Sequence, residues 1–343
     1  MASPAQAQQK AQGFALDRFY PSAPSGGWFV MDDLSMRGGL GGALALTSGY
    51  AHDPLRVTDG VTHLAVVSSQ ETTGFGFAVT YDRWRLYLNL DMPIYGTGQS
   101  GTVGNYTFTA PAVEPGLTPD ELGDPRLGLD GRILGGPKDP FRLGFGAQLF
   151  APNVRPSCPD ASTNRCDYNT DATWRAMLRV LFAGDVGRWS YAGQLGVHVR
   201  PLDDAPIPGS PRGSELLFGV AGGPRFPVGD GGTVLVIGPE IYGETAFESF
   251  LGKDTTGVEG LLTGRIEGTA DDGGQVRVKL GAGAGLDQHF GAPEWRVVVG
   301  VELFDHGVDR DHDGVTDSKD ACPDTPGVKT KDPKTNGCPA SSP

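Results

Sequence analysis

The chain has 343 residues, enough for about two domains, and its 53 glycines and 27 prolines follow no collagen-like period. Because a glycine inside a helix costs about 1 kcal/mol relative to alanine, this composition disfavours a long helical protein and favours a glycine-rich all-β chain. The net charge of −13 and the lack of any Lys/Arg run exclude a nucleic-acid binder, and no apolar run approaches the length of a transmembrane helix, about 18 residues.

Residues 1–37 form a mostly polar N-terminal segment with an aromatic pair at Trp28 and Phe29. The small residues Ala5-Gln6-Ala7 resemble a signal-peptidase site, although no apolar core precedes them, and we therefore expect an exported protein. We expect the segment either to plug the domain that comes after it or to lead into that domain from the periplasm.

Residues 38–304 follow one continuous pattern in which apolar and other residues alternate. In one such run Trp84, Leu86, Leu88 and Leu90 share a face. A period of two over so many segments is typical of strands with one apolar face. The pattern predicts twelve strands, at 40–57, 61–81, 84–96, 125–134, 139–151, 172–184, 188–200, 214–226, 233–245, 257–268, 275–287 and 295–304.

The predicted connections alternate in length along the chain. Turns such as 82–83 and 185–187 are short, 97–124 and 152–171 are long, and 58–60 is short where a long loop is expected. Bacterial outer-membrane barrels have short periplasmic turns and longer extracellular loops. We therefore predict an all-β fold, a transmembrane antiparallel up-and-down β-barrel of about twelve strands surrounded by outer-membrane lipid. A soluble sandwich is the alternative, but it gives no reason for this sorting of the connections.

The face opposite the apolar face carries charges, as a polar barrel interior requires. Basic residues concentrate on the third to seventh predicted strands, and acidic residues on the ninth and tenth. We expect these two arcs either to pair across a closed lumen or to set up a field across a narrow pore. The predicted lumen residues are Arg85, Arg126, Arg132, Arg142, Arg175, Arg179, Glu240, Glu244, Glu259 and Glu267.

Aromatic residues gather where strands meet short turns, as at Tyr81, Trp84 and Trp189, which is the position of an interfacial girdle. The last predicted strand ends in Phe304 and resembles the terminal strand that the barrel-assembly machinery recognises. We therefore expect that machinery to be a partner during insertion into the outer membrane of a Gram-negative bacterium.

The four cysteines fall into two local pairs, Cys158 with Cys166 and Cys322 with Cys338. Neither pair has the Cys-x-x-Cys spacing of a zinc site. Two short-range disulfides formed in an oxidising periplasm fit best. We expect the first to hold the long loop around it and the second to close the C-terminal module.

Residues 305–343 form that module, which has almost no large apolar side chains and contains a run with the spacing of a calcium loop. Alternate carboxylates converge on one point, Gly314 permits the sharp turn, and the Val315 carbonyl can complete the oxygen ligands of a hard cation. The last ligand is Asp rather than the Glu of an EF-hand, and no apolar helices flank the loop, so an EF-hand sensor is not expected. The predicted calcium ligands are Asp309, Asp311, Asp313, Val315, Asp317 and Asp320.

This run resembles a thrombospondin type 3 repeat over about residues 309–338, including the Asp320-Ala321-Cys322-Pro323 and Asn336-Gly337-Cys338-Pro339 ends. Such a repeat stands between the barrel and the peptidoglycan-binding domain of OmpA-family outer-membrane proteins. The resemblance implies a calcium-stabilised periplasmic linker in an envelope-anchoring protein. The barrel resembles that family in architecture alone. Peptidoglycan would be a partner only through a domain that these 343 residues do not contain.

Our leading hypothesis from the sequence is therefore a structural protein that connects the outer membrane to the cell wall. The alternatives are a porin or transporter for small solutes, with the lumen as its site, and a surface adhesin that uses the loops at 97–124 and 152–171. We expect no enzyme, because no GxSxG motif, phosphate-binding loop or nucleophile–base arrangement is recognisable. Glu240 and Glu244 could form a carboxylate pair, but a charged pore wall is the simpler interpretation.

Overall fold

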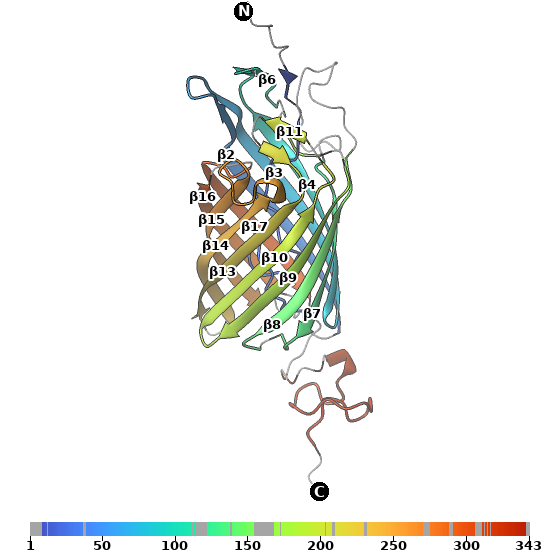
Figure 1. The fold of residues 1–343 in the computed structure, drawn as a ribbon. Coiled ribbons are helices and arrows are strands. Elements are labelled where there is room, and N and C mark those ends of the chain that lie inside the picture. Colours follow the sequence, from blue (N-terminus) through green and yellow to red (C-terminus); the bar gives the residue numbers. More distant parts are fainter. Residues whose placement is uncertain are drawn as a thin grey trace, which may run out of the picture.

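The computed structural model describes residues 9–11, 13–36, 39–111, 113, 122–137, 139–153, 168–171, 173–202, 204–207, 210–229, 232–269, 275–287, 291–305, 311, 313, 315 and 317–340. Within these residues, twelve strands pair in chain order into a closed antiparallel barrel (Figure 1). The ring closes where the last strand pairs with the first, from Trp295 opposite His52 to Asp305 opposite Gly42. The prediction of a twelve-stranded antiparallel barrel is confirmed. Its strands are β2 (Leu40–Thr58), β3 (His63–Tyr81), β4 (Trp84–Thr97), β7 (Arg126–Leu134), β8 (Arg142–Phe150), β9 (Arg175–Val186), β10 (Trp189–Val199), β13 (Glu215–Val228), β14 (Thr233–Ala246), β15 (Thr256–Thr269), β16 (Gln275–Asp287) and β17 (Trp295–Asp305).

Alternation along each strand separates an apolar exterior from a charged interior. On β9, Leu178 and Val180 are 60% and 53% exposed, whereas Arg175, Arg179 and Leu181 are buried. This is the inverse of a soluble barrel and is the pattern of an outer-membrane barrel, whose outer face meets lipid. Among the residues that the structure describes, no helix is long and apolar enough to cross a membrane.

The two ends of the barrel differ. At the short-turn end, strands join through tight turns such as Asp82–Arg83 and Gly187–Arg188. At the opposite end, the long-loop end, β2 and β3 continue beyond the wall as a paired hairpin whose tip is residues 59–62 (Figure 1). The connection at 58–60 is short for this reason, because extra strand takes the place of a long loop.

Short strands at the long-loop end were not predicted from the sequence. They are β1 (Gln9–Lys10), β5 (Gly101–Val103), β6 (Tyr106–Phe108), β11 (Asp204–Ile207) and β12 (Ser210–Arg212). β1 pairs in parallel with β6, and β5 pairs with β6 in the antiparallel sense. An apolar cluster, here called the outer cluster, ties β5, β6 and the chain directly after β1 to the hairpin; it contains Ala11, Phe14, Leu16, Leu55, Val57, Leu64, Val66, Val67, Val103, Phe108 and Tyr168.

Residues 13–36, here called the lumen segment, lie inside the barrel. Trp28, Phe29, Met31 and Leu34 have no exposed surface. They pack against inward-facing apolar residues of the wall, which include Leu181, Ala183, Ala192, Ala221, Val236, Leu261 and Val298. A ring of twelve strands is too wide for its own side chains to fill, and here a separate stretch of chain fills it.

The C-terminal module comes after β17, which ends at the short-turn end (Figure 1). Its described part contains a single-turn 3-10 helix, Asp317–Lys319, and a disulfide between Cys322 and Cys338. The backbone of Val328 pairs with that of Cys338. The module is thus closed by a covalent bond and turns rather than by a hydrophobic core.

Candidate functional site

The inner wall contains ion pairs that join one strand to another. Asp130 of β7 is fully buried and lies 3.3 Å from Arg85 of β4 and 3.2 Å from Arg179 of β9. On the far side of the ring, Glu302 of β17 lies 2.6 Å from Arg277 of β16. These charges are compensated by the wall itself, without the lumen segment.

The lumen segment adds polar contacts of its own to this wall. The Glu240 carboxylate of β14 accepts hydrogen bonds from the backbone N–H groups of Phe29 and Val30, both at 2.9 Å. Asp32 contacts Arg85, and Asp33 lies 3.8 Å from Arg265 of β15. These contacts attach the segment through groups that can also be satisfied by water.

Aromatic rings of the lumen segment meet cations of the wall. The guanidinium of Arg265 lies 4.8 Å from the Trp28 ring, and the Lys279 ammonium lies 5.0 Å from the ring of Phe29. The guanidinium of Arg296 lies at 5.0 Å from the Phe19 ring. Each such contact contributes about 0.5–1 kcal/mol when exposed and about 2 kcal/mol when desolvated, so the aromatic side chains fit a charged lumen as well as an apolar one.

Near the long-loop end, Asp171 links the lumen segment to the wall. Its carboxylate accepts a hydrogen bond from the backbone N–H of Ala15 at 2.9 Å and pairs with Arg200 and Arg175. Burial alone would raise the pKa of the Asp171 carboxyl, but the guanidiniums of Arg200 and Arg175 outweigh burial and lower that pKa. Asp171 therefore holds the segment as an ion.

A second buried cluster lies at the same level. His198 Nδ1 lies 3.3 Å from the carboxylate of Glu244 and 3.8 Å from that of Glu215. Arg18 of the lumen segment reaches both carboxylates, at 3.1 Å and 3.3 Å, and Arg200 lies 3.1 Å from Glu215. Two guanidiniums already compensate these carboxylates, so the arrangement is an ion-pair network rather than a metal site.

The residues predicted from the sequence to face the lumen lie on the inner face of the wall, with Glu267 only half-buried. The two predicted arcs do not pair with each other: no ion pair among the described residues joins one of the basic set to one of the acidic set. The prediction that the two arcs pair across the lumen is therefore wrong, because the lumen segment occupies the space between them. The actual partners are Asp32 and Asp130 for Arg85, Asp91 for Arg126, the Leu34 and Met36 carbonyls for Arg132, Asp185 for Arg142, Asp124 and Asp171 for Arg175, Asp130 for Arg179, Phe29 and Val30 for Glu240, Arg18 and His198 for Glu244, Arg296 for Glu259, and Arg265 and Arg277 for Glu267.

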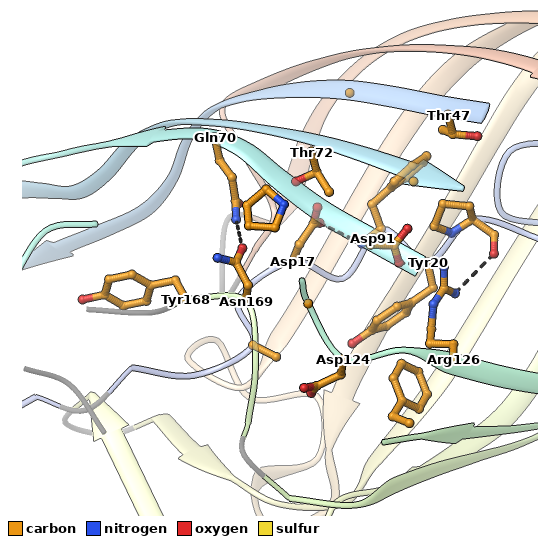
Figure 2. A pocket seen from close by; sticks show the side chains of 18 of the residues that line it. Asp17, Tyr20, Thr47, Gln70, Thr72, Asp91, Asp124, Arg126, Tyr168 and Asn169 are labelled. Carbon is orange, nitrogen blue, oxygen red and sulfur yellow. Dashed lines mark hydrogen bonds and ion pairs between the residues drawn. The ribbon is translucent and has the colours of Figure 1, made fainter. Parts of the chain in front are cut away.

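A cavity of about 70 Å³ lies between the lumen segment and the wall near the long-loop end. A cavity needs about 10–15 Å³ to hold one water, so this one has room for a few water molecules. Figure 2 shows Asp17, Gln70, Thr72 and Asp91 around it. The Gln70 Oε1 atom is buried and has no hydrogen-bond partner among the described residues.

Three Asp–Arg pairs line this cavity and make it electrically balanced. They are Asp17 with Arg296 at 2.8 Å, Asp91 with Arg126 at 3.0 Å, and Asp124 with Arg175 at 2.8 Å. A neutral solute with hydroxyl groups can donate and accept hydrogen bonds here without displacing a charge from its partner.

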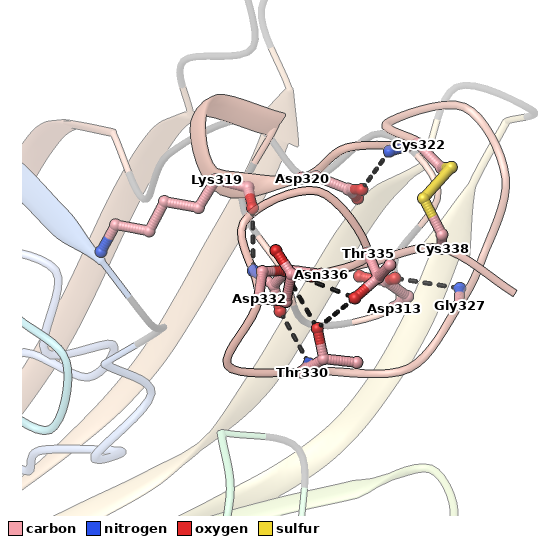
Figure 3. The surroundings of a disulfide bond; sticks show 10 residues. All are labelled: Asp313, Lys319, Asp320, Cys322, Gly327, Thr330, Asp332, Thr335, Asn336 and Cys338. Atoms are coloured by element: carbon pink, nitrogen blue, oxygen red, sulfur yellow. Dashed lines mark hydrogen bonds between the residues drawn. A yellow bond between two sulfur atoms is a disulfide. The ribbon is translucent and has the colours of Figure 1, made fainter. Parts of the chain in front are cut away.

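The C-terminal module brings part of the predicted calcium loop together. Carboxylate oxygens of Asp311, Asp313 and Asp320 lie within 4.8 Å of one another. Asp313 also accepts a hydrogen bond from the backbone N–H of Val315 at 2.8 Å and one from that of Gly327 at 3.0 Å, the second of which Figure 3 shows. Carboxylates in such a group can bind a hard cation such as calcium.

The other predicted site residues belong to the same module or lie outside the described residues. Val315 is buried in the module, and Asp317 begins its 3-10 turn. Asp320 accepts the N–H of Cys322, which is bonded to Cys338 (Figure 3). Asp309, Cys158 and Cys166 lie outside the described residues.

No family model and no curated protein matches the chain. Solved structures that resemble it include an outer-membrane channel from Pseudomonas putida F1, with 15% identity over 78% of this chain and 95% of that chain and a TM-score of 0.48. The NanC porin has 8% identity, coverage of 76% and 98%, and a TM-score of 0.41. The CymD monoaromatic hydrocarbon channel has 9% identity, coverage of 84% and 98%, and a TM-score of 0.41. The resemblance to the OmpA family and to the thrombospondin repeat stays a prediction.

Proposed function

We propose that this chain is an outer-membrane β-barrel that passes small polar solutes, with the lumen segment closing the pore. The observation that carries the proposal is the set of ion pairs between neighbouring strands on the inner wall. Besides the pairs of Asp130, Glu267 lies 3.0 Å from Arg265 and 3.1 Å from Arg277. These pairs between wall residues keep both partners when water replaces the lumen segment, and water can take the place of the segment at wall groups such as Arg132 and Glu240.

The cavity near the long-loop end supports the same proposal. It is polar, electrically balanced and large enough for a molecule with the volume of a few waters. A solute that enters from the long-loop end reaches Gln70, Thr72 and Asp91 before it meets the apolar part of the lumen segment at Trp28 and Phe29. The apolar part is therefore the barrier, and the cavity is the vestibule.

Conductance in planar bilayers tests this proposal. The double substitution Asp32→Asn and Asp33→Asn weakens two contacts of the lumen segment while leaving the pairs of Asp130 and Glu267 in place, and we expect longer and more frequent open events. The matched control removes two exposed carboxylates of the long-loop end, Asp59→Asn with Asp254→Asn, and should conduct like the parent chain. If neither variant conducts at any applied voltage, the channel proposal is contradicted.

A second function, envelope anchoring, is favoured by the module that comes after β17 at the short-turn end. Its grouped carboxylates Asp311, Asp313 and Asp320 fit a calcium-stabilised linker, and the disulfide limits the freedom of the chain around them. In this second proposal the barrel is the membrane anchor, and peptidoglycan is bound by a domain beyond the module.

Complementation separates the two functions. Cells that lack the protein would receive either the full gene or a version that stops directly before residue 311. Anchoring predicts outer-membrane blebbing that only the full gene repairs. A channel predicts a loss of solute uptake that both versions repair.

A further inference from the structure

The first strand of the barrel begins at the same end of the barrel at which the last strand ends. β2 starts with Leu40 opposite Tyr81, next to the tight turn at Asp82, and β17 ends with Asp305 opposite Gly42. The chain therefore enters the barrel wall and leaves it at the short-turn end. An even number of strands requires this arrangement, and it would by itself leave both flanking segments on one side of a membrane.

The contacts of the lumen segment extend from one end of the barrel to the other. Near the short-turn end, Arg132 of β7 donates hydrogen bonds to the Leu34 and Met36 carbonyls, both at 2.7 Å. In the middle of the ring, Phe29 donates to Glu240 of β14.

Other contacts of the lumen segment lie at the long-loop end. Asp17 pairs with Arg296, the second residue of β17, and the N–H of Leu16 donates to the Tyr168 carbonyl in the connection between β8 and β9. The segment doubles back between Ser22 and Asp33, where the Ser22 N–H donates to the Phe29 carbonyl, but its two ends lie at opposite ends of the barrel, so it spans the whole lumen.

Beyond the lumen, the chain is attached to the long-loop end. Gln9 and Lys10 pair in register with Tyr106 and Thr107 of β6 (Figure 1 labels β6 above the barrel). The Ala11 N–H donates to the Thr107 carbonyl at 2.9 Å, and the ring of Phe14 meets that of Tyr168 edge-on, with centroids 5.8 Å apart. The two ends of the segment are therefore fixed to opposite ends of the barrel.

We propose that the lumen segment is an additional membrane crossing, which places residues 9–11 on the outer surface of the cell while the C-terminal module lies in the periplasm. The proposal rests on the outer-membrane location of the barrel and on short turns facing the periplasm. The crossing needs no strand or helix, because its backbone is enclosed by protein instead of lipid. One polypeptide then joins the cell surface to the periplasm through the interior of its own barrel.

Labelling of intact cells with a membrane-impermeant maleimide tests the crossing. Lys10→Cys should react in intact cells, as should Val61→Cys, a control at the exposed tip of the β2–β3 hairpin. Arg188→Cys, in a short turn, should react only after the outer membrane is permeabilised. The parent chain, whose described cysteines form a disulfide, gives the background.

An epitope fused directly ahead of residue 9 provides a second readout that does not depend on the reactivity of one side chain. Antibody should bind it on intact cells, whereas an epitope placed after residue 340 should require permeabilisation. If residue 10 and the first epitope are both detected only in permeabilised cells, while Val61→Cys reacts in intact ones, the crossing is refuted and the channel proposal stands. If Val61→Cys is itself silent on intact cells, the long-loop end does not face the outside, and the placement of residues 9–11 on the cell surface is refuted.

Discussion

The carboxylate of Glu240 accepts a hydrogen bond of 2.9 Å from the backbone N–H of Phe29, across 211 positions of sequence. Its two oxygens also accept the N–H of Val30 at 2.9 Å and the hydroxyl of Thr263 at 2.7 Å. One fully buried side chain of β14 thereby accepts hydrogen bonds from three amides of the irregular lumen segment, that of Met31 at 3.4 Å included, and connects them to β15. The attachment of the segment can be altered at this single position.

Glu240→Gln should loosen the lumen segment. The amide presents one acceptor oxygen and two N–H donors, so the N–H of Phe29 or that of Val30 loses its partner in a buried place. We expect the folded barrel to lose about 1–3 kcal/mol, read as a lower urea midpoint in detergent micelles. Glu248→Gln, an exposed residue of the 3-10 turn after β14, is the matched control and should leave the midpoint in place.

Gly281→Leu should displace Phe29 from the lumen. A Cβ atom at Gly281 would lie 3.0 Å from the Phe29 ring and 2.9 Å from Val298, so a leucine side chain cannot share that space. We expect more frequent openings in single-channel recordings. Gly264→Leu adds the same side chain where nothing lies within 4 Å and should record like the parent chain. Equal conductance of the two variants would mean that Phe29 does not obstruct the pore.

Asp130→Ala should be more damaging than Arg179→Ala. Removing Asp130 leaves Arg179 without its carboxylate and Arg85 with Asp32 alone, whereas removing Arg179 leaves Asp130 paired with Arg85. Breaking a buried pair costs about 3–5 kcal/mol, so Asp130→Ala should lower the thermal unfolding midpoint of the barrel markedly and Arg179→Ala much less. The reverse order would contradict the role of Asp130 as the shared partner of the two guanidiniums.

Asp311→Asn combined with Asp313→Asn should abolish calcium binding by the C-terminal module. Carboxylates crowded without a cation repel one another, and a module without an apolar core has little else to offset that repulsion. Calorimetry on the full chain in detergent should give one calcium site with an affinity near 10⁻⁴ M, about that of extracellular modules. Asp324→Asn, an exposed position of the same module, should bind as the parent does. An absence of binding heat in the parent at millimolar calcium would reduce the run to an acidic spacer.

The barrel strands could be predicted from the sequence because their signal is local. A two-residue period such as that of Trp84, Leu86 and Leu88 indicates both the strand and its outward face. The inward face is harder to predict, because Leu181 and Val298 occupy the same alternating positions as Arg179 and Arg296. The charged residues of this face predicted a charged lumen but gave no sign of the apolar residues among them. These apolar interruptions of a charged face are the signal in the sequence for an apolar object inside the ring.

The path of the lumen segment could not be predicted, because its partners are spread over the whole ring. Arg85, Glu240 and Arg296 contact it from three different strands, and no period in residues 13–36 indicates which wall each residue meets. The backbone is irregular as well, with positive φ angles of 69° at Ser25 and 54° at Leu34. Only the closed ring brings these groups to one place.

The seam between β17 and β2 sets an order for biogenesis. The lumen segment immediately precedes β2, and β17 is the last strand to be synthesised, so the pairing of Trp295 with His52 can form only after every other strand exists. Passing Trp28 and Phe29 through a finished ring would require their rings to cross a closed lumen of paired charges. We therefore expect the growing sheet to curl around the lumen segment, so that the pairing of β17 with β2 closes the barrel after the segment is already inside. In such an assembly the N-terminal segment would act as the template on which the barrel closes.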